Sequence, residues 1–311
     1  MRRIKLTAAY DGTDFCGFQI QPDMRTVEGE LNRALSELTG EEIYVTGASR
    51  TDSGVHAEGN VAVFDTVSTI PAERFPYALL PFLPEDIRIV SGCEVQPEWH
   101  PRRQDCIKTY EYTFSCGGTE NPKHRRYAAY EKRIPDIERM KIAASYLVGE
   151  HDFTSFANPS SQVLKEGGSA VRTIYSIDIS QEASYSGTGA SYQYNEETKV
   201  SGLHISEMDP NRNGTEMNSD IAASKQYEAS PKSAEGNGCG KGKNRLVRIR
   251  IRGNGFLYNM VRIIAGTLMS VGTGLREPES VRTALEARDR TKAGPTAQAR
   301  GLTLLGIEYV F

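Results

Sequence analysis

The sequence is poor in residues that could build a disulfide framework or a metal cluster. It has five cysteines and five histidines among 311 residues, and both types are scattered. No two cysteines stand within four residues of each other, so there is no Cys-x-x-Cys pair; they are Cys16, Cys93, Cys106, Cys116 and Cys239. This pattern predicts reduced thiols in a cytosol-like compartment, and we expect no metal site.

Long apolar runs are also lacking. A membrane-spanning helix needs about 18 or more consecutive apolar residues, and no such run occurs. The N-terminal stretch MRRIKLTAAY carries arginines but not the apolar segment of a secretion signal. Its alternation of Ile4, Leu6 and Ala8 with polar residues predicts a strand. We therefore expect a cytoplasmic protein without a membrane partner.

The chain has no overall basic excess, since its net charge is −3. This balance argues mildly against a nucleic-acid partner. The cations are clumped, however, at 100–103, 123–126 and 245–252, and local patches matter more to a phosphate backbone than net charge does. Each clump alone is as consistent with solvated surface arginines as with a phosphate-binding patch.

The sequence does contain an alternation of strand and helix patterns. In the first half, helices are predicted over 27–39 and 72–83, and strands over 3–10, 42–46, 55–65 and 87–95. In the second half, helices are predicted over 136–148, 255–271 and 278–288, and strands over 107–116, 126–131, 170–180, 245–252 and 302–310. This order predicts an α+β fold, in which two ferredoxin-like halves form a mixed, mostly antiparallel sheet with helices on one face.

One segment departs from this alternation. Residues 180–244 hold ten serines, eight glycines, nine acidic and six basic side chains, and show little periodicity. Such a composition is typical of a loop or a disordered segment. Because it lies between two good strands, we interpret it as a surface insertion in a hairpin connection, without chemistry of its own.

The most informative stretch is SRTDSGVHAEG at 49–59. Its Asp52-Ser-Gly54 triplet suits half of an aspartic-protease dyad, but no glycine follows Asp65-Thr66, the only other partial copy. Arg50 would also keep the carboxylate ionised and prevent the proton sharing that the dyad needs. Two interpretations remain open: a turn with Gly54 at positive φ, which these residues alone favour, and a lone ionised nucleophile of the kind used in glycosyl transfer.

Three further residues bear on this choice. Tyr110, in the strand sequence KTYEY, has an aromatic face that can stack on a base, worth roughly 1–3 kcal/mol. Tyr112, on the same strand face, is expected in the core. Arg262 lies in an otherwise apolar helix pattern, so we expect it to be largely buried. A buried arginine needs a carboxylate partner, and Asp52 is a candidate.

These motifs together carry a resemblance. The stretch GASRTDSGVHA at 47–57 resembles the catalytic-loop signature of the TruA-type tRNA pseudouridine synthases. The same family shows YDG at 10–12, GFQ at 17–19, K-x-Y-x-Y at 108–112, HDFTSF at 151–156, the helix at 256–266 and ARGL at 299–302. The motifs follow the family order over 3–178 and 245–311, so that only the 180–244 segment is unmatched.

The resemblance implies a function and a role for each matching residue. Asp52 matches the nucleophile, and Tyr110 matches the tyrosine that stacks on the target uracil. Arg50 matches the arginine that helps to hold the flipped nucleotide, and Arg262 the arginine paired with the aspartate. The implied enzyme is a homodimer that isomerises uridine to pseudouridine at tRNA positions 38, 39 and/or 40, in the anticodon arm, without a cofactor. Attack at the ribose C1′ or at the uracil C6 is left open.

The implied fold has a central cleft between an N-terminal subdomain, 1–104, which carries the loop 47–56, and a C-terminal subdomain, 105–311, interrupted at about 180–244. Ser49 replaces a common glycine and Ser53 a common alanine; both are small, so we expect the loop geometry to survive. Two alternative functions are an RNA-binding or chaperone protein on the same fold with catalysis lost, and a pseudouridine synthase that acts on other RNA sites.

Overall fold

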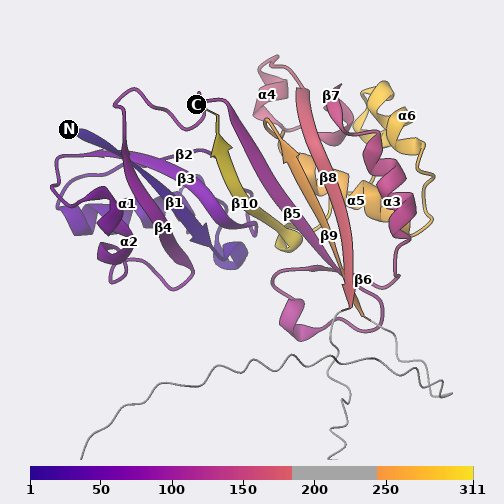
Figure 1. Cartoon of the computed structure of the whole chain (residues 1–311), viewed down its shortest axis with the longest axis horizontal. Coiled ribbons are helices and arrows are strands. Elements are labelled where there is room, and N and C mark those ends of the chain that lie inside the picture. Colours follow the sequence, from indigo (N-terminus) through magenta and orange to yellow (C-terminus); the bar gives the residue numbers. More distant parts are fainter. Residues whose placement is uncertain (184–243, 311) are drawn as a thin grey trace, which may run out of the picture. The chain divides into compact units, whose positions relative to one another are not determined.

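The computed structural model describes residues 1–183 and 244–310, and within them strands and helices alternate in two halves (Figure 1). The first half comprises β1 (Arg2–Tyr10), α1 (Val27–Thr39), β2 (Thr46–Gly47), β3 (His56–Thr66), α2 (Phe75–Ala78) and β4 (Ile87–Val95). The second half comprises β5 (Cys106–Cys116), β6 (Ala129–Glu131), α3 (Ile137–Ser145), β7 (Gly149–Asp152), α4 (Gln162–Lys165), β8 (Val171–Ala183), β9 (Arg245–Gly253), α5 (Met260–Gly272), α6 (Ser280–Ala287) and β10 (Leu302–Tyr309).

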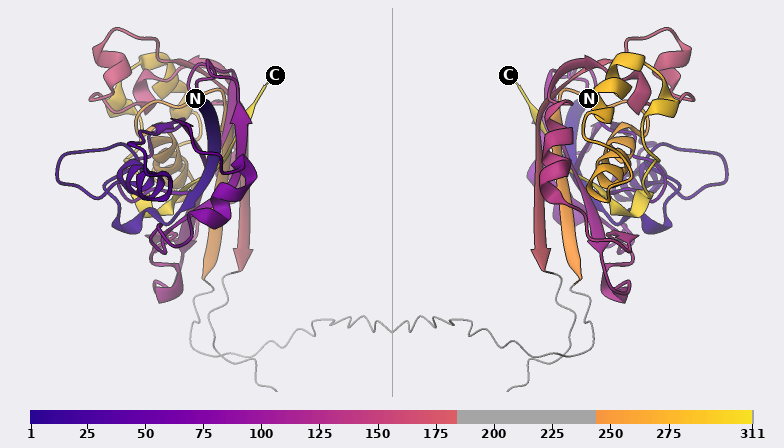
Figure 2. Two further views of the ribbon diagram at one scale, coloured as in Figure 1. Left: turned by 90° about the vertical axis from the view of Figure 1, so that its left-hand side faces the viewer. Right: turned by 90° about the vertical axis from the view of Figure 1, so that its right-hand side faces the viewer.

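All of these strands join one sheet. Its order is β4-β1-β3-β10-β5-β9-β8-β7, with β2 beside β3 and β6 beside β5. Most neighbours run antiparallel, whereas β3 and β10, and β5 and β6, run parallel. Figure 2 shows α1, α5 and α6 on one side of the strands. The prediction of an α+β fold with a mixed, mostly antiparallel sheet is confirmed.

The two halves of the sheet meet through β10. This strand pairs with β5 along most of its length, from Leu302 opposite Tyr112 to Tyr309 opposite Cys106. Its pairing with β3 is much shorter and involves only Thr303 opposite His56 and the residue after each. The loop 47–56 therefore ends at the point where the two half-sheets come together, and any site built there receives side chains from both.

Helix α5 forms the centre of the second half. Every residue of this helix is buried except Arg262, whose side chain is 18% exposed. It packs near β5 and α3, and its residue Gly266 lies so close to the segment 294–301 that an added Cβ would stand 2.0 Å from the carbonyl oxygen of Pro295. Neither α5 nor any other helix of the described ranges is long and apolar enough to cross a membrane.

Several predicted elements differ from the observed ones. The strand predicted over 42–46 shrinks to β2 because the backbone N–H groups of Ile43 and Val45 bond side chains of α1 instead of a neighbouring strand. The helix predicted over 72–83 is a short 3₁₀ turn followed by α2, since the chain there is interrupted by prolines, including Pro81. Helix α5 begins at Met260 rather than at 255, because Asn259 is left-handed.

Other boundaries are close to prediction, and two short elements were not predicted. Thr26 caps α1 and Gly40 ends it with φ of 72°, as the sequence indicates. Strand β8 runs to Ala183, three residues beyond its predicted end at 180, and the rest of the predicted insertion, 184–243, lies outside the described residues. The missed elements, β7 and α4, have four residues each, too few for a periodic pattern.

We predict that Gly266→Ala weakens the fold, because its Cβ would overlap the Pro295 carbonyl and force the segment 294–301 away from α5. Overpacking of this kind costs about 1–3 kcal/mol of unfolding free energy, measurable by urea titration. Gly306→Ala is the matched control, since nothing lies within 4 Å of its added Cβ. Equal stability of the two variants would contradict the close approach.

Candidate active site

A cleft of about 700 Å³ opens beside the loop 47–56. Residues from both halves line it: the loop itself, the 16–21 segment, strand β5, the start of α4 and the 254–261 segment before and into α5. Among the lining residues are Arg50, Asp52 and Tyr110. The predicted nucleophile, the predicted stacking tyrosine and one predicted arginine thus share one cavity.

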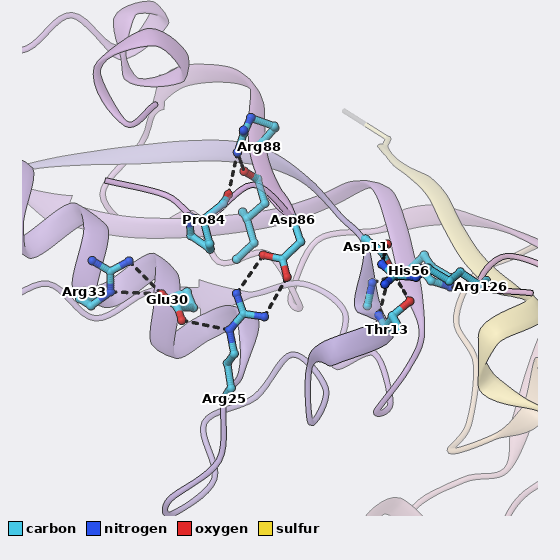
Figure 3. Close-up of polar contacts among 12 residues, drawn as sticks. Asp11, Thr13, Arg25, Glu30, Arg33, His56, Pro84, Asp86, Arg88 and Arg126 are labelled. Atoms are coloured by element: carbon cyan, nitrogen blue, oxygen red, sulfur yellow. Dashed lines mark hydrogen bonds and ion pairs between the residues drawn. The ribbon is translucent and has the colours of Figure 1, made fainter. Parts of the chain in front are cut away.

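The loop 47–56 is held from behind by the segment 10–18. Gly12 lies directly against the loop, and an added Cβ there would stand 2.0 Å from the carbonyl oxygen of Val55. The backbone N–H of Phe18 donates to the Thr51 carbonyl at 3.0 Å. The Cys16 N–H donates to the carbonyl of Arg25 at 2.8 Å, and the Arg25 side chain forms a two-pronged ion pair with Asp86 (Figure 3). A rigid segment therefore sets the position of the loop.

Asn60, on β3, is the polar centre of this support. It is fully buried, and its amide donates to the Ser49 carbonyl at 2.9 Å and to the Tyr10 hydroxyl at 3.0 Å. Its side-chain oxygen accepts from the Ser49 N–H at 3.2 Å. The Tyr10 hydroxyl in turn bonds Thr51 Oγ1 at 2.7 Å. A buried amide with this many partners fixes the residues on either side of Arg50.

Asp52 faces an arginine from the other half. Its Oδ2 lies 3.4 Å from Nη1 of Arg262, as the buried-arginine argument predicts. Arg262 is itself held in place, because Nε donates to the Ala297 carbonyl at 2.8 Å and Nη1 to Oδ1 of Asn259 at 2.9 Å. Gly54 has φ of 77°, as the turn interpretation predicts, and the Asp52 carboxylate of the same loop is 20% exposed.

The direction of the Asp52 pKa differs from the prediction. We expected a nearby guanidinium to lower it. Burial instead raises the pKa of the Asp52 carboxyl above its ordinary value, and the charge and hydrogen bond of Arg262 offset this only in part. Arg50 does not pair with Asp52: within the described residues its one side-chain hydrogen bond runs from Nη1 to Oε1 of Gln162 at 3.3 Å, and both residues line the cleft.

Tyr110 lies deep in the cleft wall. Its ring packs edge-on against Phe256 at 5.3 Å between centroids, and its hydroxyl bonds Ser49 Oγ at 2.7 Å. Burial raises the pKa of this hydroxyl to about 12, so it is protonated at neutral pH. Tyr112, as predicted, lies in the core and donates to the Gln298 carbonyl.

Lys108 is a further residue of the cleft, and no role was predicted for it. Its Nζ donates to the Ala48 carbonyl at 3.1 Å, and burial lowers its pKa. Asn259, Phe256 and Asn60 were also missed. A cation two residues before Tyr110 was a usable signal for Lys108, because alternate residues of a strand face the same side. No local signal identifies Asn60, since its role depends on three segments meeting in space.

The three basic clumps have different surroundings. The outward-facing arginines of β9 each reach a glutamate of β8, β5 or β10, so the 245–252 clump is largely neutralised; the pairs are Arg248–Glu182 at 2.6 Å, Arg250–Glu111 at 2.9 Å and Arg252–Glu308 at 3.2 Å. The 100–103 clump places Arg102 in the cleft wall. The described residues contain no group of three His, Cys, Asp or Glu side chains suited to a metal ion.

Comparison with known proteins identifies the family. The family model described as tRNA pseudouridine synthase matches residues 6–102 and 143–310. The tRNA pseudouridine synthase A of Brevibacillus brevis is 38% identical over 309 residues, which cover 99% of this chain and 100% of that protein. The tRNA pseudouridine synthase A of Bacillus pumilus is 36% identical over 309 residues, with 99% of each chain covered.

Among the described residues that line the cleft, Asp52 is the only carboxylate, so the site lacks the second aspartate that an aspartic-protease dyad needs. The matches to the family model and to these relatives cover most of the chain and are more specific than the site alone. This chain belongs to the tRNA pseudouridine synthase family, and it is an isomerase.

We predict that Arg262→Gln moves the acidic limb of the pH profile of kcat/KM to higher pH. Arg262 lowers the Asp52 pKa, so its loss lets burial raise that pKa further, and less of the carboxylate is ionised at a given acidic pH. Arg250→Gln, which removes an arginine paired with Glu111 on β9, is the control and should leave the profile unchanged. An unshifted acidic limb in Arg262→Gln would contradict this account of the ion pair.

Proposed function

We propose that this chain isomerises uridine to pseudouridine at positions 38, 39 and/or 40 of tRNA, with Asp52 as the nucleophile. One observation carries the proposal. Asp52 is the only carboxylate among the described residues that line the cleft, whereas Arg50, Arg102 and Lys108 line it with positive charge. Such a positively charged wall can bind a polyanionic substrate. A single carboxylate is sufficient for a reaction in which the base is detached from the ribose and then bonded to it again.

Binding of the target nucleotide requires it to leave the RNA stack, which costs a few kcal/mol. We assign to Tyr110 the stacking on the uracil that offsets part of this cost, roughly 1–3 kcal/mol per base. To Arg50, which is exposed in the cleft and donates to Gln162, we assign the holding of the flipped nucleotide. The supports of the loop 47–56 keep Asp52 in position while the base enters.

The chemistry that we assign to Asp52 conserves every atom of the substrate. Its carboxylate forms a bond to the ribose C1′ or to the uracil C6, and the bond between N1 and C1′ breaks. The uracil turns within the cleft, C5 bonds to C1′, and the carboxylate is released. The proton lost from C5 is balanced by the one gained at N1. No leaving group departs, so no second carboxylate is needed as an acid.

We predict that Asp52→Asn abolishes pseudouridine formation while tRNA affinity stays within about tenfold, since phosphate contacts supply most of the affinity. Tritium release from tRNA labelled at the uridine C5 measures the first, and filter binding the second. Multiple turnover by Asp52→Asn would exclude the nucleophile role.

We predict a small effect for Tyr110→Phe, because the ring is kept and only the bond to Ser49 is lost. The rate should fall by about tenfold or less, well short of the factor of roughly 10²–10⁴ expected for a general base. Ser49→Ala is the matched control, since it removes the same hydrogen bond and leaves the hydroxyl. If Tyr110→Phe is slower than Ser49→Ala by about a hundredfold, the hydroxyl takes part in proton removal.

The remaining predictions from the sequence are kept as part of the proposal. They are a homodimer, a cytoplasmic location, and subdomains 1–104 and 105–311 on either side of the cleft. The homodimer is open to a direct test, because light scattering would give twice the chain mass of 34.4 kDa.

A further inference from the structure

A basic loop outside the cleft is fixed to the loop 47–56 from two sides. Residues 117–128, between β5 and β6, hold the 123–126 clump. Lys123 and Arg125 are exposed, and neither takes part in an ion pair among the residues that the structure describes. In this they differ from the paired arginines of β9. We call residues 117–128 the basic loop.

The first anchor is formed by Asp11 and His56 (Figure 3). His56 is buried, and its Nδ1 accepts from the Gly12 N–H at 3.0 Å and lies 3.2 Å from Asp11 Oδ1. Its Nε2 donates to the Arg126 carbonyl at 2.9 Å, because a carbonyl oxygen can only accept. The Tyr127 hydroxyl donates to Asp11 Oδ2 at 2.7 Å, and its ring lies 5.0 Å from that of His56.

The second anchor is Arg300, just before β10. Its Nη1 donates to the Arg125 carbonyl at 2.9 Å, and its Nη2 lies 3.1 Å from Glu120. The residue before it, Ala299, lies against Gly54, whose added Cβ would stand 3.3 Å from the Ala299 Cβ. The segment that holds the basic loop thus also touches the turn that follows Asp52.

Both anchors lead directly to the nucleophile. His56 is the last residue of the loop 47–56. It accepts a hydrogen bond from the Gly12 N–H, and Gly12 lies against Val55. Val55 N–H in turn donates to the Asp52 carbonyl at 3.1 Å. On the other side, Ala297, three residues before Arg300, accepts from Arg262, the partner of Asp52. A displacement of the basic loop would therefore be transmitted to Asp52 along both routes.

We infer that the basic loop is a docking surface for the phosphate backbone of the substrate RNA, and that His56 is a positioning residue that couples this surface to Asp52. The inference rests on the proposed function. Exposed cations without acidic partners can bind phosphates. The backbone of the basic loop is already held by His56 and Arg300, so RNA binding would have to order few further residues of the protein. The bond from Nε2 of His56 to the Arg126 carbonyl fixes the distance between docked RNA and the loop 47–56.

Salt-dependent tRNA binding tests the surface. Each phosphate contact contributes roughly 0.7–0.9 to the slope of log Kd against log salt, so the double variant K123A/R125A should lower the slope by about 1–2. The control R248A/R250A removes two arginines that are already ion-paired and should leave the slope unchanged. An unchanged slope in K123A/R125A would overturn the docking surface.

The coupling is tested by two substitutions of His56 that differ in whether the hydrogen bond from the Nε2 position to the Arg126 carbonyl is kept. The amide nitrogen of His56→Gln can replace Nε2 as donor to Arg126, whereas His56→Asn is too short to do so. We expect His56→Asn to lower kcat by about tenfold or more with unchanged tRNA affinity, and His56→Gln to restore most of it. Equal kcat for His56→Asn and the wild type would overturn the positioning role.

Tyr127→Phe keeps this experiment decisive if His56→Asn does not fold. Tyr127 is exposed, and the change removes only its bond to Asp11, so kcat should fall with no change in melting temperature. An unchanged kcat would count against the coupling. The two proposals fail in different ways: a wild-type chain that turns over no tRNA refutes the proposed function, whereas the salt slope of binding is measured without turnover.

Discussion

The ion pair between Asp52 and Arg262 is the constraint on which the site depends. The two residues are 210 positions apart and come from different halves of the sheet. Both are mostly removed from water, and a mostly buried charge that loses its partner is strongly destabilising. The loop 47–56 must therefore lie where α5 presents its one charge. The close approach of the 294–301 segment to Gly266, and the bond from Arg262 to the Ala297 carbonyl, follow from the same requirement.

Burial and pairing act on Asp52 in opposite directions. Burial raises its pKa and Arg262 lowers it, with burial the stronger. A carboxylate in this state is poorly solvated, which favours attack on carbon. Its ionised form is stabilised by Arg262 rather than by water. The supports behind the loop, with buried Asn60 as their centre, are what keep such a group in a fixed place. The hydrogen bonds of Asn60 are neutral, so they add no charge that would compete with Arg262.

Much of this could be predicted from the sequence. The strand and helix order gave the α+β fold, and the lone arginine of an apolar helix pointed to a carboxylate partner. The sign of the Asp52 pKa shift could not be predicted, because it depends on how deeply the loop is buried. The role of Arg50 at Gln162, the fixed loops around Asn60 and the neutralised arginines of β9 also depend on contacts between distant segments. Short elements such as β7 were missed because four residues are too few to show a periodic pattern of apolar side chains.

The central claim is that the lone carboxylate of this cleft isomerises uridine in the anticodon arm of tRNA. Mapping of pseudouridine at single-nucleotide resolution, in tRNA from cells with and without this protein, tests it most directly. The account predicts pseudouridine at one or more of positions 38, 39 and 40 that disappears with the protein and leaves other sites unchanged. Pseudouridine that persists at all three positions, or is lost only elsewhere, would contradict it.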